Sequence, residues 1–315
     1  MNRRSFNKMV AASGIAFFLG KFGIKSLFAQ ESLKMLSTED SKTISKKAKK
    51  EFSKSGCSGA MYHSFNQAFQ FPYDTQGLTL EQYMQAFGGG LMRKGYQCGL
   101  LTGATVAIGA EAFHRYKDRD TAILATITAT QTLRKAFIDR KGTVNCRNII
   151  NMDISTGWGL AKYMLSGKAI SCTNMAKKWA PDAIEAANNG LTLAQIGQST
   201  PAMNCASVIA QKMKANDFEM VLASGFAGGL GLSGDTCGAM ITAVWINTVK
   251  WYKAGNEVNL SNPNAEKTLK VFSDATNGET LCSKICGQRF TSIDEHSKFI
   301  KNGGCKKIID ILADC

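Results

Sequence analysis

The amino-acid sequence predicts an all-α fold made of two tandem helical subdomains that are related by an internal duplication. The chain has 315 residues, of which 44% are hydrophobic and 20% charged, so it can bury a sizeable core. It contains only four prolines, and apolar residues recur at helical spacing in most segments, with no convincing alternating strand. A glycine-rich stretch around a cysteine also occurs twice along the chain. Together these features favour helices over a sandwich or a barrel.

Residues 1–29 predict an export signal. They combine a basic start, an apolar stretch over residues 9–20 that is too short to span a membrane, and Ala29 near the expected cleavage point. The run Arg3-Arg4-Ser5-Phe6-Asn7-Lys8 resembles the twin-arginine signal, although an asparagine replaces its usual leucine. The resemblance implies the twin-arginine export machinery as a partner, a periplasmic location and a protein exported already folded with its cofactor. An ordinary secretory signal or an uncleaved membrane anchor is the alternative.

The positive charge is concentrated near the N-terminus. Five of the charges that make up the formal net charge of +14 lie in residues 1–29, which leaves 14 − 5 = +9 for the remainder. Residues 30–54 are rich in lysine and are interpreted as a linker, either a solvated helix or a tether. They lack the interleaved aromatic side chains and arginines of a nucleic-acid arm, so no nucleic-acid partner is predicted. Association with an anionic membrane surface stays open.

The duplication shows most clearly around two cysteines. The stretch Phe87-Gly88-Gly89-Gly90-Leu91 matches Phe226-Ala227-Gly228-Gly229-Leu230, and Cys98-Gly99 matches Cys237-Gly238 in the same register. Three further cysteines in each half follow the same order along the chain. We therefore predict one repeat over residues 55–190 and another over residues 200–315, which together resemble a dimer within one chain; a homodimer is the other possibility.

Helical periodicity and stop signals place the main elements. Residues 98–115 and 119–140 each predict a helix, and Gly142 is expected to end the second of these. In the other repeat, residues 236–253 and 264–275 are their expected counterparts, while residues 80–87 and 218–226 predict shorter helices before the glycine loops. Two prolines and an Asn-Asn-Gly sequence predict a linker near residues 188–202.

Eight of the ten cysteines fall into the repeat, and they are the candidate metal ligands. The first set is Cys57, Cys98, Cys146 and Cys172, and the second set is Cys205, Cys237, Cys282 and Cys305. Cys286 and Cys315 lie outside this scheme. Cysteine at the first turn of a helix lies where backbone N–H groups and the helix dipole favour a negative sulfur, as expected for Cys98 and Cys237.

Four cysteines per half suit three chemistries. Four thiolates can hold an iron–sulfur cluster, and the glycines of the loop would let backbone N–H groups approach its sulfur atoms. They can also close a zinc site, although the usual Cys-x2-Cys knuckles are absent. In an oxidising compartment they can form two disulfides. The spacing alone does not choose between a cluster and disulfides.

The order of the cysteines resembles the redox-active family named for its C, GCAxxG, C, C pattern. Here the central motif is Cys98-Gly99-Leu100-Leu101-Thr102-Gly103, and the resemblance covers most of residues 55–315. It implies electron transfer or redox sensing with a [2Fe–2S] or [4Fe–4S] cluster, Gly99, Gly103 and Gly238 beside the cofactor, and a redox partner protein. Two departures are visible, since Leu100 replaces the alanine of the motif and Thr242 replaces its last glycine in the second copy.

The family includes the split-Soret cytochromes, which add c-type haem to an iron–sulfur centre, but this chain has no Cys-x-x-Cys-His run, so no c-type haem is predicted. No nucleophile elbow, phosphate-binding loop or zinc-protease helix motif is present either. We therefore expect an electron carrier more than a substrate-transforming enzyme. A metal-free protein, stapled by disulfides or active through its thiols as a binding or structural module, is the alternative.

Overall fold

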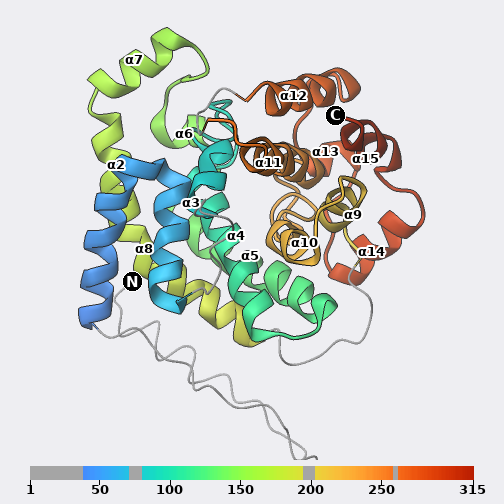
Figure 1. The fold of residues 1–315 in the computed structure, drawn as a ribbon, viewed down its shortest axis with the longest axis horizontal. Coiled ribbons are helices and arrows are strands. Elements are labelled where there is room, and N and C mark those ends of the chain that lie inside the picture. Colours follow the sequence, from blue (N-terminus) through green and yellow to red (C-terminus); the bar gives the residue numbers. More distant parts are fainter. Residues whose placement is uncertain (1–37, 71–79, 194–202, 258–261) are drawn as a thin grey trace, which may run out of the picture. The chain divides into compact units, whose positions relative to one another are not determined.

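The computed structural model describes residues 38–70, 80–193, 203–257 and 262–315, and all of them belong to one compact unit, Met35–Cys315. The predicted export signal lies outside these residues. Within the described part the regular elements are helices, with two isolated β-bridges and no strands, which confirms the all-α prediction (Figure 1). No helix in the described part combines the length and apolar character needed to cross a membrane.

The first repeat contributes the elements that follow residue 38. They are α2 (Thr38–Phe69), α3 (Leu80–Tyr83), the 3₁₀ helix η1 (Met84–Phe87), α4 (Gly99–Arg115), α5 (Arg119–Lys141), α6 (Cys146–Ile150), α7 (Gly157–Leu165) and α8 (Lys168–Leu193). Asp118 caps the start of α5 by accepting from the Thr121 N–H. Gly142 ends it in the left-handed conformation with φ 70°, as the sequence predicts.

The second repeat has its elements in the same order, and none is longer than its counterpart when α3 and η1 are taken together. They are α9 (Cys205–Lys212), α10 (Asp217–Ser224), α11 (Gly238–Lys253), α12 (Pro263–Ala275), α13 (Cys282–Ile285), α14 (Ile293–Lys301) and α15 (Lys306–Ala313). Each of the six helices expected from periodicity is therefore present to within a few residues. The short helices α6, α7, α13 and α14 are not among the predicted elements.

Two segments interpreted as linkers are helical where they are described. Residues 38–54, the described part of the lysine-rich segment, form the first part of α2, in which Ile44 and Ala48 are buried one turn apart. The apolar stripe docks this segment on the protein while its lysines stay exposed. At the other predicted linker, α8 continues through the Asn-Asn-Gly sequence to Leu193, because Gly190 packs against the backbone of Ala129 in α5. Residues 194–202 lie outside the described residues.

The two repeats pack directly against each other. Helix α10 lies on α4 and α5 of the first repeat, where Gly109 brings α4 against the backbone of Leu222. Phe87 and Phe226, which are equivalent in the duplication, meet with ring centroids 5.5 Å apart. Contact between equivalent residues is what an approximate twofold axis between the copies requires. The two repeats thus form a packed internal pair rather than two separate domains.

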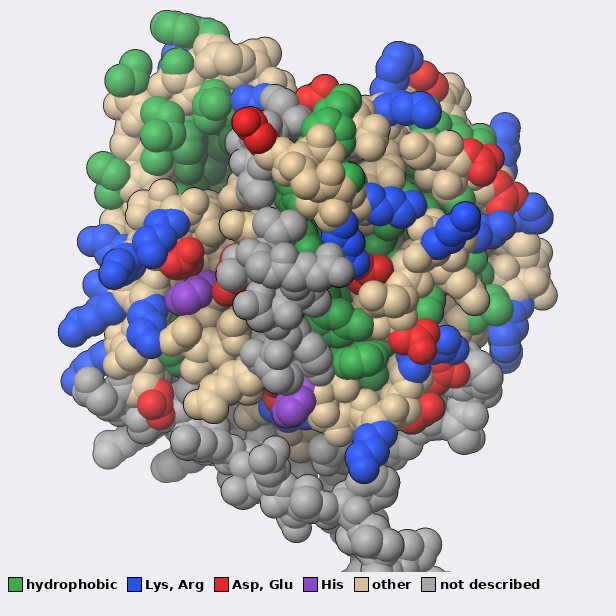
Figure 2. All heavy atoms as spheres, in the orientation of Figure 1, with side chains coloured by type: hydrophobic (Ala, Val, Ile, Leu, Met, Phe, Trp, Pro, Cys, Tyr) green, Lys and Arg blue, Asp and Glu red, His purple; other side chains and the backbone are tan. Residues whose placement is uncertain are grey.

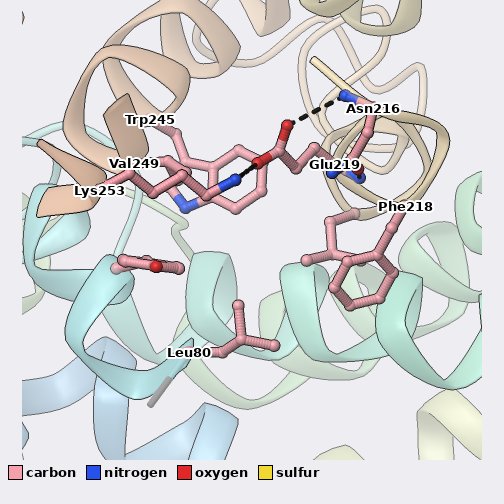
Figure 3. A pocket seen from close by; sticks show the side chains of 9 residues that line it. Leu80, Asn216, Phe218, Glu219, Trp245, Val249 and Lys253 are labelled. Atoms are coloured by element: carbon pink, nitrogen blue, oxygen red, sulfur yellow. Dashed lines mark hydrogen bonds and ion pairs between the residues drawn. The ribbon is translucent and has the colours of Figure 1, made fainter. Parts of the chain in front are cut away.

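A small gap also lies on this boundary. Figure 3 shows Leu80 of the first repeat facing Trp245 and Phe218 of the second, beside the Lys253–Glu219 ion pair of 2.6 Å. The gap has a volume of about 20 Å³, which is room for about one water molecule. It is too small to hold a substrate, so the candidate site lies elsewhere.

Candidate cysteine sites

Each repeat folds its glycine-rich stretch into the same tight loop. In the first repeat the N–H groups of Gly95 and Tyr96 donate to the carbonyls of Gly89 and Gly90, at 3.1 and 2.9 Å. In the second repeat the equivalent bonds, from Gly234 and Asp235 to Gly228 and Gly229, measure 2.9 and 3.1 Å. The backbone hydrogen bonds of the loop are therefore duplicated along with the sequence.

The last glycine before the leucine of this loop makes room for a cysteine. Gly90 and Gly229 both have φ 77°, and a Cβ on either would lie 2.8 Å from the Cβ of Cys146 or Cys282. A side chain there would be strained by the backbone conformation and would also displace the cysteine. This close approach explains why the loop needs glycine.

In each repeat a β-bridge then forms between two residues that directly precede cysteines. Gln97 pairs with Asn145, the Cys98 N–H donates to Val144 at 2.8 Å, and the Cys146 N–H donates to Tyr96 at 2.6 Å. The second repeat repeats this pattern with the bridge from Thr236 to Leu281, and with bonds of 2.8 Å from Cys237 and 2.7 Å from Cys282. The bridge brings together cysteines that are 48 and 45 residues apart in the chain.

The remaining cysteines approach from other helices. Cys57 follows the kink that Gly56 introduces into α2, and Cys205 is the first residue of α9. The N–H of Gly228 donates to Cys205 Sγ at 3.4 Å, and its equivalent, Gly89, donates to the Cys57 sulfur. Cys98 and Cys237 are the N-caps of α4 and α11, as predicted. Backbone N–H groups therefore point at sulfur at equivalent places in both repeats.

The fourth cysteine differs between the repeats. Cys172 lies one turn inside α8 and hydrogen bonds to the Tyr163 hydroxyl of α7. Cys305 instead is the N-cap of α15, in the left-handed conformation with φ 60°. The thiols of each half nevertheless interact electrostatically, since neighbouring cysteines raise the pKa of Cys98 in the first half and of Cys205 in the second. The structure thus gathers each predicted set of four.

Burial dominates the titration of four of these thiols. It is the main cause that raises the pKa of Cys98 and Cys205 well above the usual thiol value, that of Cys146 to about 12 and that of Cys237 to about 11. Hydrogen bonds from backbone N–H groups lower the pKa of Cys237, but they do not offset burial. The helix termini therefore do not make these cysteines reactive thiolates.

The structure adds Cys286, which the sequence left outside the scheme, to the second site. Its sulfur lies 3.8 Å from Cys282 Sγ and 3.5 Å from Cys305 Sγ. Hydrogen bonding to Cys282 is the largest cause that raises the pKa of Cys286 to about 12. The four-residue spacing from Cys282 was the available signal, since it places both on one helix face. Cys315 hydrogen bonds to the Ile311 carbonyl and takes no part in either group of thiols.

The glycines predicted beside the cofactor hold neighbouring segments close together. A Cβ on Gly99 would collide with Cys57 Sγ, and one on Gly103 would collide with the backbone of Ser58, so both bring α4 close to α2. A Cβ on Gly238 would collide with the Phe226 carbonyl in the same way. Of the three, Gly99 alone meets a sulfur atom.

The two sites approach one surface cavity. Tyr96, Asn145 and Arg147 line it from the first repeat, and Thr236 and Leu281 line it from the second. Asn145, Thr236 and Leu281 directly precede cysteines of the two sites. The cavity is mostly polar and has a volume of about 370 Å³. Both cysteine sites therefore lie just behind a shared hollow between the repeats.

The spacing of the thiols bears on the kind of metal centre. Across the described residues, no three His, Cys, Asp or Glu side chains are arranged to hold a single metal ion. A tetrahedral zinc ion with bonds of about 2.3 Å would place its sulfur ligands about 3.8 Å apart. Ligands of an iron–sulfur cluster bind different iron atoms and can stand further apart. Four thiols per half supply the number of donors that either kind of centre requires, and the separation of 3.8 Å between the Cys282 and Cys286 sulfur atoms is also that of a tetrahedral zinc site.

Comparison with known proteins identifies the repeats. The family model described as "Putative redox-active protein (C_GCAxxG_C_C)" matches residues 55–185 and again residues 201–315. No curated protein and no solved structure matches the chain significantly. The double match confirms the duplication that the cysteine and glycine pattern predicts.

Proposed function

The chain belongs to the C_GCAxxG_C_C family of redox-active proteins, and we propose that it transfers electrons through an iron–sulfur cluster in each half. The proposed ligands are the four thiols of each set, namely Cys57, Cys98, Cys146 and Cys172, then Cys205, Cys237, Cys282 and Cys305. The observation that carries the proposal is the convergence of four buried or partly buried thiols from separate elements, twice, around equivalent N–H donors. A bound cluster would supply an electron carrier whose potential depends on its charge, hydrogen bonds and exposure.

The protonation of the thiols supports a metal-bound state. Without a metal, burial keeps the pKa of Cys98 and Cys205 far above neutral pH, so these thiols would be protonated and poor nucleophiles. A coordinating metal removes the proton outright and compensates the charge of the thiolate. The site therefore suits metal ligation better than thiol exchange.

The chain's own groups would stabilise the additional negative charge of a reduced centre. The N–H groups of Gly89 and Gly228 donate to Cys57 and Cys205, and the Tyr163 hydroxyl donates to Cys172. The core around Cys98 and Cys237 excludes water, since each is only 4% exposed. A partner protein would approach through the hollow lined by Tyr96 and Thr236, behind which both sites lie.

Iron and acid-labile sulfide, measured with the visible spectrum on protein purified without oxygen, test the proposal. We expect both elements in matching amounts, with Cys98→Ser and Cys237→Ser each removing about half of them and the double variant removing all. Cys315→Ser is the matched control, because Cys315 lies outside both sites, and it should leave the content unchanged. A colourless, iron-free wild-type protein would overturn the proposal.

A metal-free function is the second candidate, and one contact favours it. Cys286 and Cys305 lie 3.5 Å apart, so a small rotation of the side chains would bring their sulfur atoms towards bonding distance. A disulfide-stapled or thiol-active binding module would contain no iron and would show oxidised cysteines in the protein as isolated. Thiol counting after denaturation distinguishes the two candidates.

We also propose export by the twin-arginine route to the periplasm. It rests on Arg3-Arg4 and the apolar stretch that follows, which lie outside the described residues. Replacing Arg3 and Arg4 by lysine should block export if the protein must fold around its cofactor first. Unchanged export of that variant would favour the general secretory route and the metal-free candidate.

A further inference from the structure

Helix α7 exposes an unusual number of large apolar side chains. Trp158 is 71% exposed, Met164 62% and Leu165 85%, and Ile170 at the start of α8 is 68% exposed. Gly159 is the one residue of α7 that is buried. We call these four apolar residues the α7 patch. Figure 2 shows hydrophobic side chains gathered where Figure 1 places α7, and a contiguous exposed group of this kind marks a binding surface.

The equivalent helix of the second repeat has no such patch. Both helices start after a hydroxyl N-cap, Thr156 or Ser292, and both precede a glycine in the left-handed conformation, Gly167 or Gly303. With this alignment, Asp294 stands in the place of Trp158 and Lys301 in the place of Leu165. Helix α14 therefore has an ordinary charged outer face, and the apolar face of α7 is specific to the first repeat.

Every charged side chain in the segment that carries the α7 patch is positive. No Asp or Glu occurs between Asp153 and Asp182, whereas Lys162, Lys168 and the pair Lys177-Lys178 lie in this segment. Lys162 and the Lys177-Lys178 pair are exposed, and Lys168 is partly exposed. An apolar helix face with tryptophan and leucine, flanked by lysines, has the composition of an element that lies in a membrane interface.

We propose that α7 docks the protein on an anionic lipid surface. Trp158, Leu165 and their apolar neighbours would enter the headgroup region while the lysines contact lipid phosphates. A second copy fits this surface less well, because face-to-face pairing would bring the lysines of two copies together, while the nearest carboxylate along the chain, Asp153, is paired with Arg147. The docking would place the first cysteine site next to the membrane, since Tyr163 of α7 contacts Cys172. The proposal does not depend on what the cysteines bind.

Trp158 provides a local probe in the full-length protein. Trp179 and Trp245 are almost completely buried, so Trp158 is the most exposed tryptophan in the described part of the chain. We expect its emission to shift to shorter wavelength with phosphatidylglycerol vesicles, to be quenched by brominated lipids, and to be much less affected by pure phosphatidylcholine. Trp158→Phe identifies its share of the signal. Because this readout reports contact at α7 itself, binding through residues 1–37 alone would leave it unchanged and would overturn the proposal.

Co-sedimentation with the same vesicles separates the apolar and charged contributions. The double variant Trp158→Asp/Leu165→Lys carries the residues found at the same places in α14 and keeps the net charge, and we expect at least about tenfold weaker binding. Lys162→Gln/Lys168→Gln should weaken binding about 25-fold, or about fivefold for each lysine. Lys298→Gln/Lys301→Gln in α14 is the matched control and should change binding by less than about twofold.

Two other outcomes would contradict the proposal. Equal effects of the α7 and α14 charge variants would mean that the overall positive charge, not the α7 patch, attracts the lipid. Concentration-dependent dimerisation that Trp158→Asp/Leu165→Lys abolishes, with no vesicle binding by the wild type, would identify a second copy as the occupant.

Discussion

The two cysteine sites share one backbone frame but differ in the side chains around it. The glycine loop, the β-bridge and the N–H group directed at the first sulfur recur at equivalent residues. Around this frame, Ile150 of the first site is replaced by Cys286 in the second, and Gly103 of α4 is replaced by Thr242 in α11. Both copies have therefore kept the hydrogen-bonded loop. They differ at positions where the backbone conformation accepts more than one type of residue.

This difference indicates which parts of the site the cysteines depend on. The loop positions Gly90 and Gly229 combine φ 77° with a close approach to a cysteine, so no other residue fits either copy. Gly103 has ordinary helical geometry and is restricted only by the contact of α4 with α2. Its counterpart, Thr242, is fully buried in α11, which packs against α9.

The largest expected effect comes from exchanging the residues at this divergent position. Gly103→Thr should lower the free energy of unfolding by about 3 kcal/mol or more, because its Cβ would collide with the backbone of Ser58, which cannot rotate away. Thr242→Gly should cost about 1 to 2 kcal/mol, for the lost packing and the greater freedom of glycine in a helix. Urea unfolding of both variants measures the contrast. Similar losses would mean that the two helices are packed equally tightly.

A smaller effect is expected in the pH dependence of the metal-free protein. Burial, the largest cause, raises the pKa of Cys237 from 9.0 to about 11 in the folded chain. The folded state therefore holds this proton more tightly, so the stabilisation is complete below about pH 9 and is lost as the pH rises towards about 11. The loss amounts to about 2 to 3 kcal/mol for this one thiol, at about 1.4 kcal/mol per pH unit.

Urea midpoints measured from about pH 8 to about pH 11 check this expectation. Other groups titrate in the same range, so the informative quantity is the difference between the wild type and Cys237→Ala. The variant should lose less stability across this range. Parallel curves would show that Cys237 binds its proton equally well in the folded and unfolded states, and hence that burial does not control its titration.

Local signals in the sequence were sufficient for much of this fold and its sites. The helices over residues 98–115 and 119–140 have strong periodicity and a clear stop at Gly142, and the family match confirms the duplication. The grouping of four cysteines in each half followed from the repeat. These features depend on short-range patterns or on matching two copies of one pattern, both of which a single sequence contains.

Tertiary packing decided the features that the sequence did not predict. The lysine-rich residues before Cys57, for which the sequence left a solvated helix or a tether open, form a helix that is docked on the protein through Ile44 and Ala48. Helix α8 continues past a linker-like sequence because Gly190 fits against α5. Cys286 joins the second site because Cys305 starts α15 beside it. Each of these outcomes depends on a neighbour that is distant in the chain.

The smallest change in stability is expected at the position that differs most in chemistry. Cys286→Ile takes the residue of the first repeat and should cost about 1 kcal/mol, since Ile150 is accommodated at the equivalent place.

The redox effect of Cys286→Ile should be clear, because the wild-type metal-free protein treated with diamide should form a Cys286–Cys305 disulfide while the first site keeps its thiols. In that reaction the two thiols lose two protons and two electrons to the diazene, and the variant should lose no thiols at this pair. Peptide mapping by mass spectrometry, with Cys315→Ser as the control, reads out the bond. If the disulfide instead forms between Cys282 and Cys305, the additional cysteine is a bystander, and the second site differs from the first only in packing.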